Sequence, residues 1–309
     1  MIDATTFHYL RYIAEFGKNH IDIADFNARL VNFAANHNFI ESHNASGANW
    51  VAGHNQFSDM HHVEYKAMLG YVRGEQDVRN AVMLDTSANA ASVNWVEAGA
   101  VTAVKDQGQC GSCWTFSTTG SLEGAHFLAT GELLSFSESQ LVDCAGLRYG
   151  NMGCNGGLQD NAYKYYEAGY DAMLESAYPY VAKKGSCQYD AKNATNVTVS
   201  TYTHVAVDDY QQMKAAMNIA PLAVAIEADQ RVFQTYKSGV LDSDKCGTTL
   251  DHAVLAVGYG TDAASGLDYW LVKNSWNTTW GDNGYIKLAM NSGAGICGVQ
   301  SDAEWPTSN

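Results

Sequence analysis

The chain has 309 residues, 46% of them hydrophobic, and a formal net charge of −15. This length and apolar content suffice for one large core or two smaller ones, which excludes a chain that is disordered throughout. The negative charge argues against nucleic acid or an anionic membrane surface as a partner, because both repel an acidic protein.

The first 45 residues carry a helical pattern. Phe26, Leu30, Phe33, His37 and Ile40 recur at intervals of three and four, with polar residues on the opposite face. An ordinary amphipathic helix would account for these spacings alone. We therefore expect residues 1 to about 45 to be helical.

Two more specific patterns overlie this helix. The first consists of Asp25, Arg29, Phe33, Asn36, Ile40 and Asn44. Its spacing resembles the ERFNIN signature of cathepsin L-like propeptides, with Asp in place of the usual Glu. Residues 53–59, Gly-His-Asn-Gln-Phe-Ser-Asp, match the second propeptide motif, Gly-x-Asn-x-Phe-x-Asp, at every fixed position. The resemblance implies that residues 1–87 are a helical inhibitory propeptide of the I29 type.

The same segment is rich in histidine. Residues 1–87 hold seven of the ten histidines and ten acidic against six basic residues, a net charge of −4 that leaves −11 for the remainder. Protonation of all seven would bring the segment to +3, so pH is expected to affect its stability and docking. Stronger attraction to the acidic remainder would tighten docking, whereas charging buried histidines would loosen the segment itself. The alternative is that these histidines are simply exposed.

From Val72 to about Ala91, charges and small residues replace the periodic pattern, which is typical of a linker open to proteolysis. The next residues, Val93-Asn94-Trp95, resemble the first strand of papain-like enzymes. We therefore expect a peptidase domain at residues 88–309.

Residues 106–117, Asp-Gln-Gly-Gln-Cys-Gly-Ser-Cys-Trp-Thr-Phe-Ser, place an amide and two cysteines ahead of an apolar run. If Cys113 opens a helix, the unpaired amides of the first turn and the positive end of the dipole lower the pKa of its thiol. Gln107 then lies upstream, where its amide can donate to an oxyanion. The run Cys-Gly-Ser-Cys-Trp is the local signature of papain and cathepsin nucleophiles. We expect this helix to end at Thr130-Gly131.

The two halves of the expected peptidase differ in character. Residues 88–196 predict a helical half held by disulfides, and residues 197–309 a mainly β half. The expected strands are residues 197–207, 222–226, 253–259, 269–272 and 284–288. The chain resembles the papain family, cathepsin L-like branch, from about residue 7 to 306. This resemblance implies an α+β fold of two lobes, one helical and one β-barrel-like.

A cysteine nucleophile needs a base, and only three histidines follow residue 87. His126 is too far along the same helix from Cys113, and His204 has no motif around it. His252 opens an apolar strand and follows Cys113 by 139 residues, within the range of the family. His252 is therefore the predicted base.

The resemblance implies the remaining chemistry. Asn274 would accept a hydrogen bond from His252, and Trp276 would shield that bond from water. The Cys113 thiolate, paired with the His252 imidazolium, would attack a peptide carbonyl, while Gln107 and the Cys113 backbone N–H hold the oxyanion. His252 would then protonate the leaving amine, and water would hydrolyse the thioester.

Seven cysteines leave one thiol unpaired, and six cysteines allow fifteen pairings. The resemblance implies the bridges Cys110–Cys154, Cys144–Cys187 and Cys246–Cys297. No Cys/His set has the spacing of a metal site, so neither a metal nor another cofactor is expected.

Substrate recognition is also predicted by the resemblance. Gly111, Gly156 and Gly157 are expected to face an extended peptide, which binds by strand addition, and Trp276 also lies along the substrate site. The pocket for the side chain two residues before the cleaved bond would be lined by Leu158, Gln159, Ala225, Leu250 and Asp302. A carboxylate at its floor predicts acceptance of Arg or Lys alongside Leu and Phe. The alternative is that Asp302 turns outward to solvent.

The predicted protein is therefore a monomeric cysteine endopeptidase zymogen that acts on proteins and peptides, with its own propeptide as inhibitor. We expect a secreted or lysosomal location, with a signal preceding residue 1. Glycosylation sequons begin at Asn44, Asn193, Asn196 and Asn277, and Asn277 replaces a usual glycine. No apolar run is long enough to span a membrane. The alternatives are a catalytically silent papain-like binding protein and, more remotely, a redox protein using Cys110 and Cys113.

Overall fold

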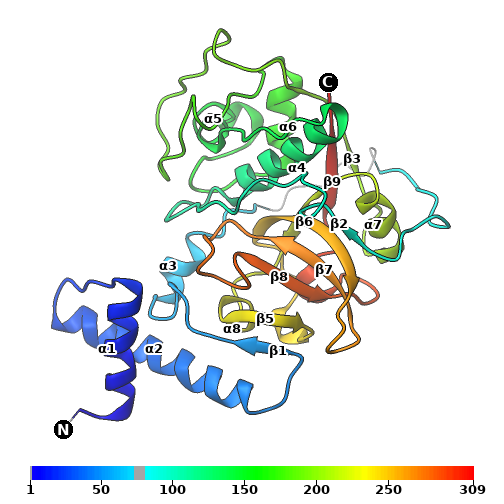
Figure 1. Ribbon diagram of the computed structural model, residues 1–309. Coiled ribbons are helices and arrows are strands. Elements are labelled where there is room, and N and C mark those ends of the chain that lie inside the picture. The colour runs from blue at the N-terminus through cyan, green and yellow to red at the C-terminus, as the bar shows by residue number, and fades with distance from the viewer. Residues whose placement is uncertain (1, 73–80) are drawn as a thin grey trace.

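The computed structural model describes residues 2–72 and 81–309. Helices α1 (Ala4–Phe16) and α2 (Ile23–Asn44) open the chain and pack around the buried rings of Tyr9, Tyr12 and Phe33 (Figure 1). Gly17 ends α1 in the left-handed conformation, with φ 60°. The helical prediction for residues 1 to about 45 is therefore confirmed, with the segment divided into two helices.

The rest of the N-terminal segment, defined here as residues 2–72, lies along the remainder of the chain. Strand β1 (Trp50–Ala52) pairs antiparallel with β5 (Tyr236–Leu241), and helix α3 (His62–Lys66) follows. Figure 1 shows β1 at the edge of the large sheet. The sequence did not predict β1, which has only three residues.

The helical part of the remainder is organised around α4 (Cys113–Thr130), whose start and end match the prediction. Gly120 allows the sheet to approach closely, because a Cβ there would lie 2.9 Å from Leu255 Cδ2. The elements that accompany α4 are α5 (Glu138–Cys144), a 3₁₀ turn (Leu147–Tyr149) and α6 (Gln159–Glu167). In Figure 1 they form the layer above the sheet.

The sheet has the order β1-β5-β8-β7-β6-β4-β9-β3 among the described strands, and β2 (Val93–Asn94) pairs with β6. All of these pairings are antiparallel except β5–β8. The other strands are β3 (Val199–His204), β4 (Leu222–Ile226), β6 (His252–Thr261), β7 (Asp268–Lys273), β8 (Tyr285–Ala289) and β9 (Ala303–Ser308). Short 3₁₀ turns span Asp244–Cys246 and Ile296–Gly298. The five predicted strands are confirmed, whereas β5 and β9 were not predicted.

Two further helices, α7 (Tyr210–Met217) and α8 (Arg231–Gln234), lie near the sheet. Part of the expected linker, residues 73–80, lies outside the described residues. Its later part lies along α7, because Gln212 exchanges side-chain hydrogen bonds with the backbone of Leu84.

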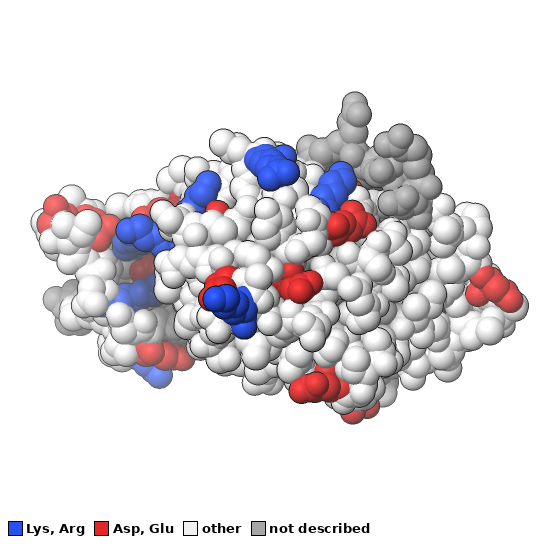
Figure 2. Space-filling view, turned by 90° about the horizontal axis from the view of Figure 1, so that it is seen from above, with Lys and Arg blue, Asp and Glu red and all other residues white. Residues whose placement is uncertain are grey.

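The hydrophobic core is shared between the N-terminal segment and the sheet. One buried cluster joins Ile40, Trp50, Phe57 and Tyr65 to residues of β4 through β8, and a second surrounds α4 and α6. On the face seen from above, most of the surface is uncharged, and Lys/Arg and Asp/Glu side chains are scattered over it singly or in small groups (Figure 2). No helix in the described ranges has the length and apolar character needed to cross a membrane.

Three disulfides link loops of the structure, and they are the pairs that the resemblance implied. They join Cys110 to Cys154, Cys144 to Cys187, and Cys246 to Cys297.

Candidate active site

Cys113 is the first residue of α4 and the free cysteine of the described chain. Its side chain is fully buried, and its sulfur accepts N–H groups from Gly70 at 3.2 Å and from Ala253 at 3.4 Å. Burial raises the pKa of the thiol to about 11, although both N–H groups act in the opposite direction. The thiolate expected from the helix terminus is therefore disfavoured while the N-terminal segment covers the sulfur.

His252 is the first residue of β6 and precedes Ala253, whose N–H reaches the Cys113 sulfur. Its Nε2 lies 2.8 Å from Asn274 Oδ1, and the Trp276 ring stacks on it with centroids 4.7 Å apart. All three side chains are buried, so Trp276 lies where it shields the His252–Asn274 bond. Burial lowers the pKa of His252 to about 4. In this state both the thiol and the imidazole are neutral.

Gln107 lies beside these groups with every polar atom of its amide in use. Its Nε2 donates to the carbonyl oxygens of Met68, at 2.8 Å, and Cys110, at 2.9 Å. Its Oε1 accepts from Ser275 Oγ and Trp276 Nε1. The amide is thereby fixed, and the donor predicted for an oxyanion holds a carbonyl of the N-terminal segment instead.

The N-terminal segment runs over Cys113 and forms an isolated β-bridge beside it. Gly157 N–H donates to Gly70 O at 2.9 Å, and Val72 N–H donates to Gly157 O at 3.2 Å, in a parallel bridge. The contact at Gly70 requires glycine, because a Cβ there would lie 1.9 Å from the Gly111 carbonyl oxygen. The predicted substrate glycines thus lie against this segment, which blocks an extended peptide from the same place.

The next residue of the segment, Tyr71, fills an apolar pocket. Its ring belongs to the buried cluster that contains Ala225 and Leu250, with Leu158 packed against that cluster. Its hydroxyl donates a short hydrogen bond to Asp302 Oδ2. Of the five predicted pocket residues, Leu158, Ala225 and Leu250 therefore belong to or pack against the cluster that contains Tyr71, and Asp302 is hydrogen-bonded to it. The Asp302 side chain points inward rather than to solvent.

Gln159 differs from the prediction. Its amide donates to Ser117 Oγ at 3.2 Å and to the Val224 carbonyl oxygen at 3.3 Å, so it connects α4, α6 and β4 inside the fold. Gly156 does face the segment, because a Cβ there would lie 2.7 Å from Val72 Cγ2.

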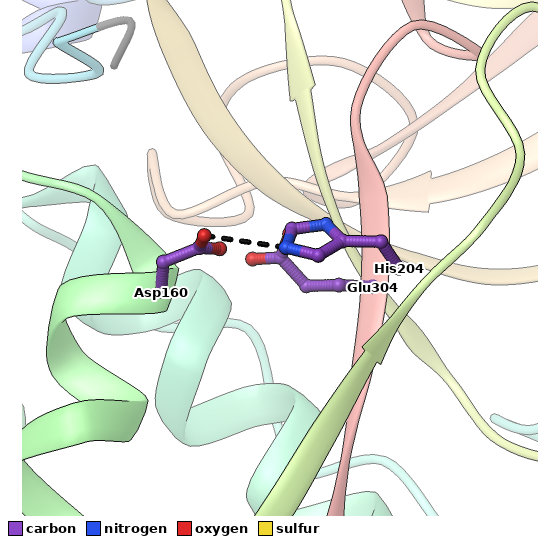
Figure 3. Close-up of side chains that lie close together, drawn as sticks. All are labelled: Asp160, His204 and Glu304. Atoms are coloured by element: carbon purple, nitrogen blue, oxygen red, sulfur yellow. Dashed lines mark hydrogen bonds and ion pairs between the residues drawn. The ribbon is translucent and has the colours of Figure 1, made fainter. Parts of the chain in front are cut away.

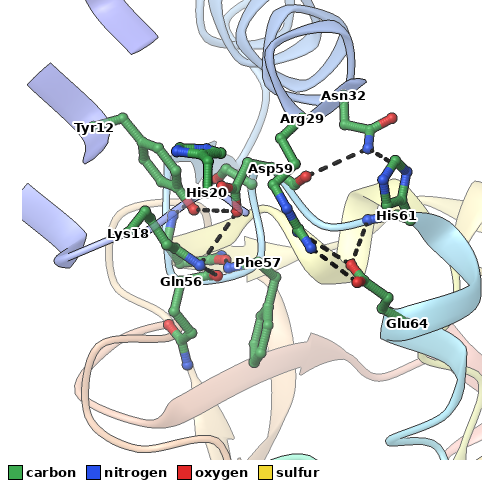
Figure 4. A network of polar contacts seen from close by, with 12 residues as sticks. Tyr12, Lys18, His20, Arg29, Asn32, Gln56, Phe57, Asp59, His61 and Glu64 are labelled. Atoms are coloured by element: carbon green, nitrogen blue, oxygen red, sulfur yellow. Dashed lines mark hydrogen bonds and ion pairs between the residues drawn. The ribbon is translucent and has the colours of Figure 1, made fainter. Parts of the chain in front are cut away.

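A buried carboxylate holds the N-terminal segment together (Figure 4). Asp59, which ends the second motif, accepts hydrogen bonds from the hydroxyls of Tyr9 and Tyr12 and lies 3.2 Å from Lys18 Nζ. Arg29 pairs with Glu64 through two hydrogen bonds in the same region. The two motifs also contact each other directly, because Asn36 Nδ2 of the first donates to the Ser58 carbonyl oxygen of the second at 2.9 Å.

Asn44, the last residue of the first motif, makes hydrogen bonds that bear on its glycosylation. The Asn44 amide accepts from Ala52 N–H and donates to the Ala52 carbonyl oxygen, both at 2.9 Å. A glycan on Asn44 would replace one of the two hydrogens of Nδ2, the atom that donates to Ala52. Asn193, Asn196 and Asn277 are exposed. The left-handed φ of 62° at Asn277 explains how Asn replaces the glycine usual at this position, since Asn tolerates that conformation.

The second motif also supplies hydrogen bonds between the N-terminal segment and residues 81–309. Asn55 Nδ2 donates to the Gln234 carbonyl oxygen, and Gln56 Nε2 to that of Trp276, both at 2.7 Å. Gln56 thus binds the loop that follows Asn274. The N-terminal segment is therefore attached at three places: at strand β5, at the loop after Asn274 and at the Cys113 sulfur.

One cluster of potential metal ligands lies elsewhere among the described residues. His204 Nε2 and Nδ1 each lie 3.2 Å from a carboxylate, of Asp160 and Glu304 respectively (Figure 3). Both carboxylates hold the imidazole charged and raise its pKa to about 11, although burial acts in the opposite direction. Because both ring nitrogens are engaged, the cluster is explained as a buried ion-pair network.

Sequence reasoning missed Tyr71 and the partners of His204. A signal for the first was available, because Leu69-Gly70-Tyr71 places glycine between large apolar residues shortly after the second motif. No local signal marked His204, whose partners are distant in sequence.

Two family descriptions match the chain. "Papain family cysteine protease" covers residues 89–307, and "Cathepsin propeptide inhibitor domain (I29)" covers residues 9–65. Digestive cysteine proteinase 1 of Homarus americanus is 47% identical over 255 residues, which span 82% of this chain and 78% of that protein. Cathepsin L of Sarcophaga peregrina is 46% identical over 264 residues, which span 82% and 77%.

Solved structures agree with these matches. Digestive procathepsin L 3 of the Tenebrio molitor larval midgut superposes with a TM-score of 0.87 at 36% identity, covering 99% of both chains. The recombinant stem bromelain precursor superposes with a TM-score of 0.89 at 34% identity, with the same coverage.

Proposed function

The chain belongs to the papain family of cysteine proteases, and we propose that its geometry is that of a cathepsin L-like endopeptidase held inactive by its own propeptide. The domain division is residues 1–87 for the propeptide and 88–309 for the peptidase, with helical and mainly β lobes meeting near residue 196. The observation that carries the proposal is the position of Cys113 at a helix start, where its sulfur accepts N–H groups from Gly70 and from Ala253, the residue after His252.

We assign the reaction to Cys113, His252, Asn274 and Gln107. His252 takes the thiol proton, and the thiolate attacks the peptide carbonyl carbon to form a tetrahedral oxyanion. Gln107 Nε2 and the Cys113 backbone N–H donate to that oxyanion. The C–N bond breaks as His252 gives its proton to the amine. Water then attacks the thioester while His252 accepts its proton, which releases the acid and restores the thiol.

Propeptide removal changes the electrostatics of these groups. Its departure exposes the sulfur and imidazole to water, which removes the burial that raises one pKa and lowers the other. It also frees Gln107 Nε2 from the Met68 carbonyl oxygen. The thiolate–imidazolium pair and the oxyanion donor therefore become available together, after processing.

Acidic conditions favour this release. Seven histidines lie in the propeptide, and the half-buried His54 resists protonation because its pKa is lowered, so acid destabilises the folded propeptide rather than tightening it. We assign the enzyme to an acidic, disulfide-permissive compartment, lysosomal or secreted, as a monomer that acts on proteins and peptides.

The decisive experiment is activation of the zymogen at acidic pH with a thiol, followed by titration with an epoxide alkylator. We expect loss of the segment ending near residue 87, appearance of peptide hydrolysis and labelling of Cys113. A Cys113→Ser zymogen is the matched control and neither processes itself nor takes up the label. A labelled residue other than Cys113, or processed protein without hydrolysis, contradicts the proposal and favours a silent binding protein.

Specificity is proposed to follow from Asp302. Its carboxylate at the end of the pocket admits Arg or Lys, alongside Leu and Phe, two residues before the cleaved bond. Dipeptide-coumarin substrates test this on the processed enzyme. We expect Asp302→Ala to reduce the ratio of arginine to leucine cleavage, and an unchanged ratio would refute the assignment.

A further inference from the structure

Tyr71 occupies the specificity pocket as a ligand would. Its side chain is 7% exposed and packs in the cluster that contains Ala225 and Leu250. Its backbone is held on both sides, because Tyr71 N–H donates to Asp251 O at 3.0 Å and Gly157 forms a bridge with it. The ring therefore enters the pocket from a fixed backbone position, which limits where its hydroxyl can lie.

The hydroxyl meets the charged end of the pocket. It donates to Asp302 Oδ2, the carboxylate at the pocket floor. A phenol in an apolar pocket without a partner would lose its hydrogen bonds to water, so this contact decides whether tyrosine is accepted there. Phenylalanine would fill the same volume and leave the carboxylate without this donor.

The charge behind the pocket strengthens this selection. Glu304 lies two residues beyond Asp302, and with Asp160 it flanks His204 (Figure 3). Asp160 and Glu304 thus flank one imidazolium, and Asp302 adds a third carboxyl group, at the Tyr71 hydroxyl. Burial and the charges of Asp302, Glu304 and Asp160 raise the pKa of Tyr71, so its hydroxyl remains a donor.

We propose that this pocket selects side chains that carry a hydrogen-bond donor beyond an apolar ring or stem, and that Tyr71 anchors the propeptide by the same determinant. Tyrosine is then preferred to phenylalanine two residues before the cleaved bond. The inference rests on the proposed function, because it takes the cluster around Tyr71 to be the pocket for that substrate residue.

The first test compares two dipeptide-coumarin substrates that differ only by the hydroxyl, with Tyr or Phe at this position, on the processed enzyme. We expect kcat/KM to favour Tyr by about tenfold, the size expected from one hydrogen bond to a carboxylate. Asp302→Ala is expected to bring the ratio to about one or below. A wild-type ratio near one, or a preference for Tyr that survives Asp302→Ala, overturns the substrate part of the inference.

The second test uses the intact zymogen at neutral pH and measures the rate of Cys113 alkylation, which reports opening of the propeptide. Tyr71→Phe and Asp302→Ala are each expected to raise this rate by about tenfold, and the double variant no further, because each removes the same Tyr71–Asp302 hydrogen bond between propeptide and pocket. Tyr65→Phe is the matched control. Its hydroxyl donates to the Ala228 carbonyl oxygen, so its effect should multiply with that of Asp302→Ala.

The outcomes separate the two proposals. Rates that multiply in the Tyr71→Phe, Asp302→Ala double variant, or an unchanged rate in Tyr71→Phe, overturn the anchor. If the arginine to leucine ratio responds to Asp302→Ala but Tyr and Phe substrates remain equal, the inference fails and the proposed function stands. If the processed wild-type enzyme hydrolyses no substrate, the proposed function itself fails.

Discussion

A cluster of histidines makes the propeptide sensitive to acid, and His54 is its half-buried member with a lowered pKa. The His54 ring stacks on Phe33 with centroids 4.5 Å apart, and its Nε2 lies 3.1 Å from His37 Nδ1. His8 lies against His37 in turn, with centroids 4.8 Å apart. The other residues that border the cavity beside this cluster are Arg11, Tyr12 and Glu15. Glu15 and Arg11 therefore place one negative and one positive charge on the lining of this cavity.

The magnitude follows from the pKa of His54. Burial, then the charges of His37 and His8, lower it from 6.5 to about 4. Because the folded form binds the proton less readily than the unfolded form, stability is complete above pH 6.5 and falls as the pH drops toward 4. At pH 5 this amounts to about 2 kcal/mol, and screening at a half-buried site reduces it to about 1 kcal/mol.

Hydrogen exchange of α1 and α2 amides measures this loss in a Cys113→Ser zymogen, which does not process itself. After correction for intrinsic exchange, wild-type protection should fall between pH 7 and pH 5 by about fivefold through His54 alone, the equivalent of about 1 kcal/mol. His54→Phe keeps an aromatic ring stacked on Phe33 but has no group to protonate. Its protection should therefore fall about fivefold less than that of wild type over the same pH range. His62→Gln, an exposed propeptide variant, is the control. Equal pH-dependent losses in wild type and His54→Phe would refute the mechanism.

Three further variants test the contacts that restrain and perform the chemistry. Gly70→Ala should make the zymogen leaky, seen as faster Cys113 labelling at neutral pH, because its Cβ would lie 1.9 Å from Gly111 O; a rate equal to wild type would contradict this contact. Asp59→Ala leaves buried tyrosine hydroxyls and Lys18 without their carboxylate and should destabilise the propeptide by about 3 kcal/mol in denaturant titration; a loss below about 0.5 kcal/mol would show that Asp59 is dispensable. Gln107→Ala should lower kcat of the processed enzyme by about 100-fold with little change in KM, and an equal rise in KM instead would argue against transition-state binding.

Local sequence was sufficient where one element carries its own signals. The helix Cys113–Thr130 begins at the nucleophile signature and ends before Gly131, which adopts φ 79°. Strand β4 also matches the predicted residues 222–226, because a continuous apolar run buried on both faces has few other conformations open to it. The choice of His252 needed only the count of histidines and the strand that follows it.

Strands that depend on a partner could not be predicted in this way. β5 contains Lys, Ser and Gly, and β9 contains Pro306, so neither shows the composition of a strand. β1 has three residues and exists as a strand because β5 offers it an edge. Each is decided by a neighbour far away in the chain, whose position a local window does not contain.

The sequence by itself determined the family and the identity of the propeptide, and it supplied the residues proposed for the reaction, because motifs with fixed spacing carry them. The tertiary structure decided the charge state of the covered site and the occupants of its pockets. The hydrogen bonds between Gln107 and Met68 and between Tyr71 and Asp302 join residues that are far apart in the sequence. Such contacts depend on how the whole core packs, and burial of charge, which sets the pKa values here, exists only once that core has formed.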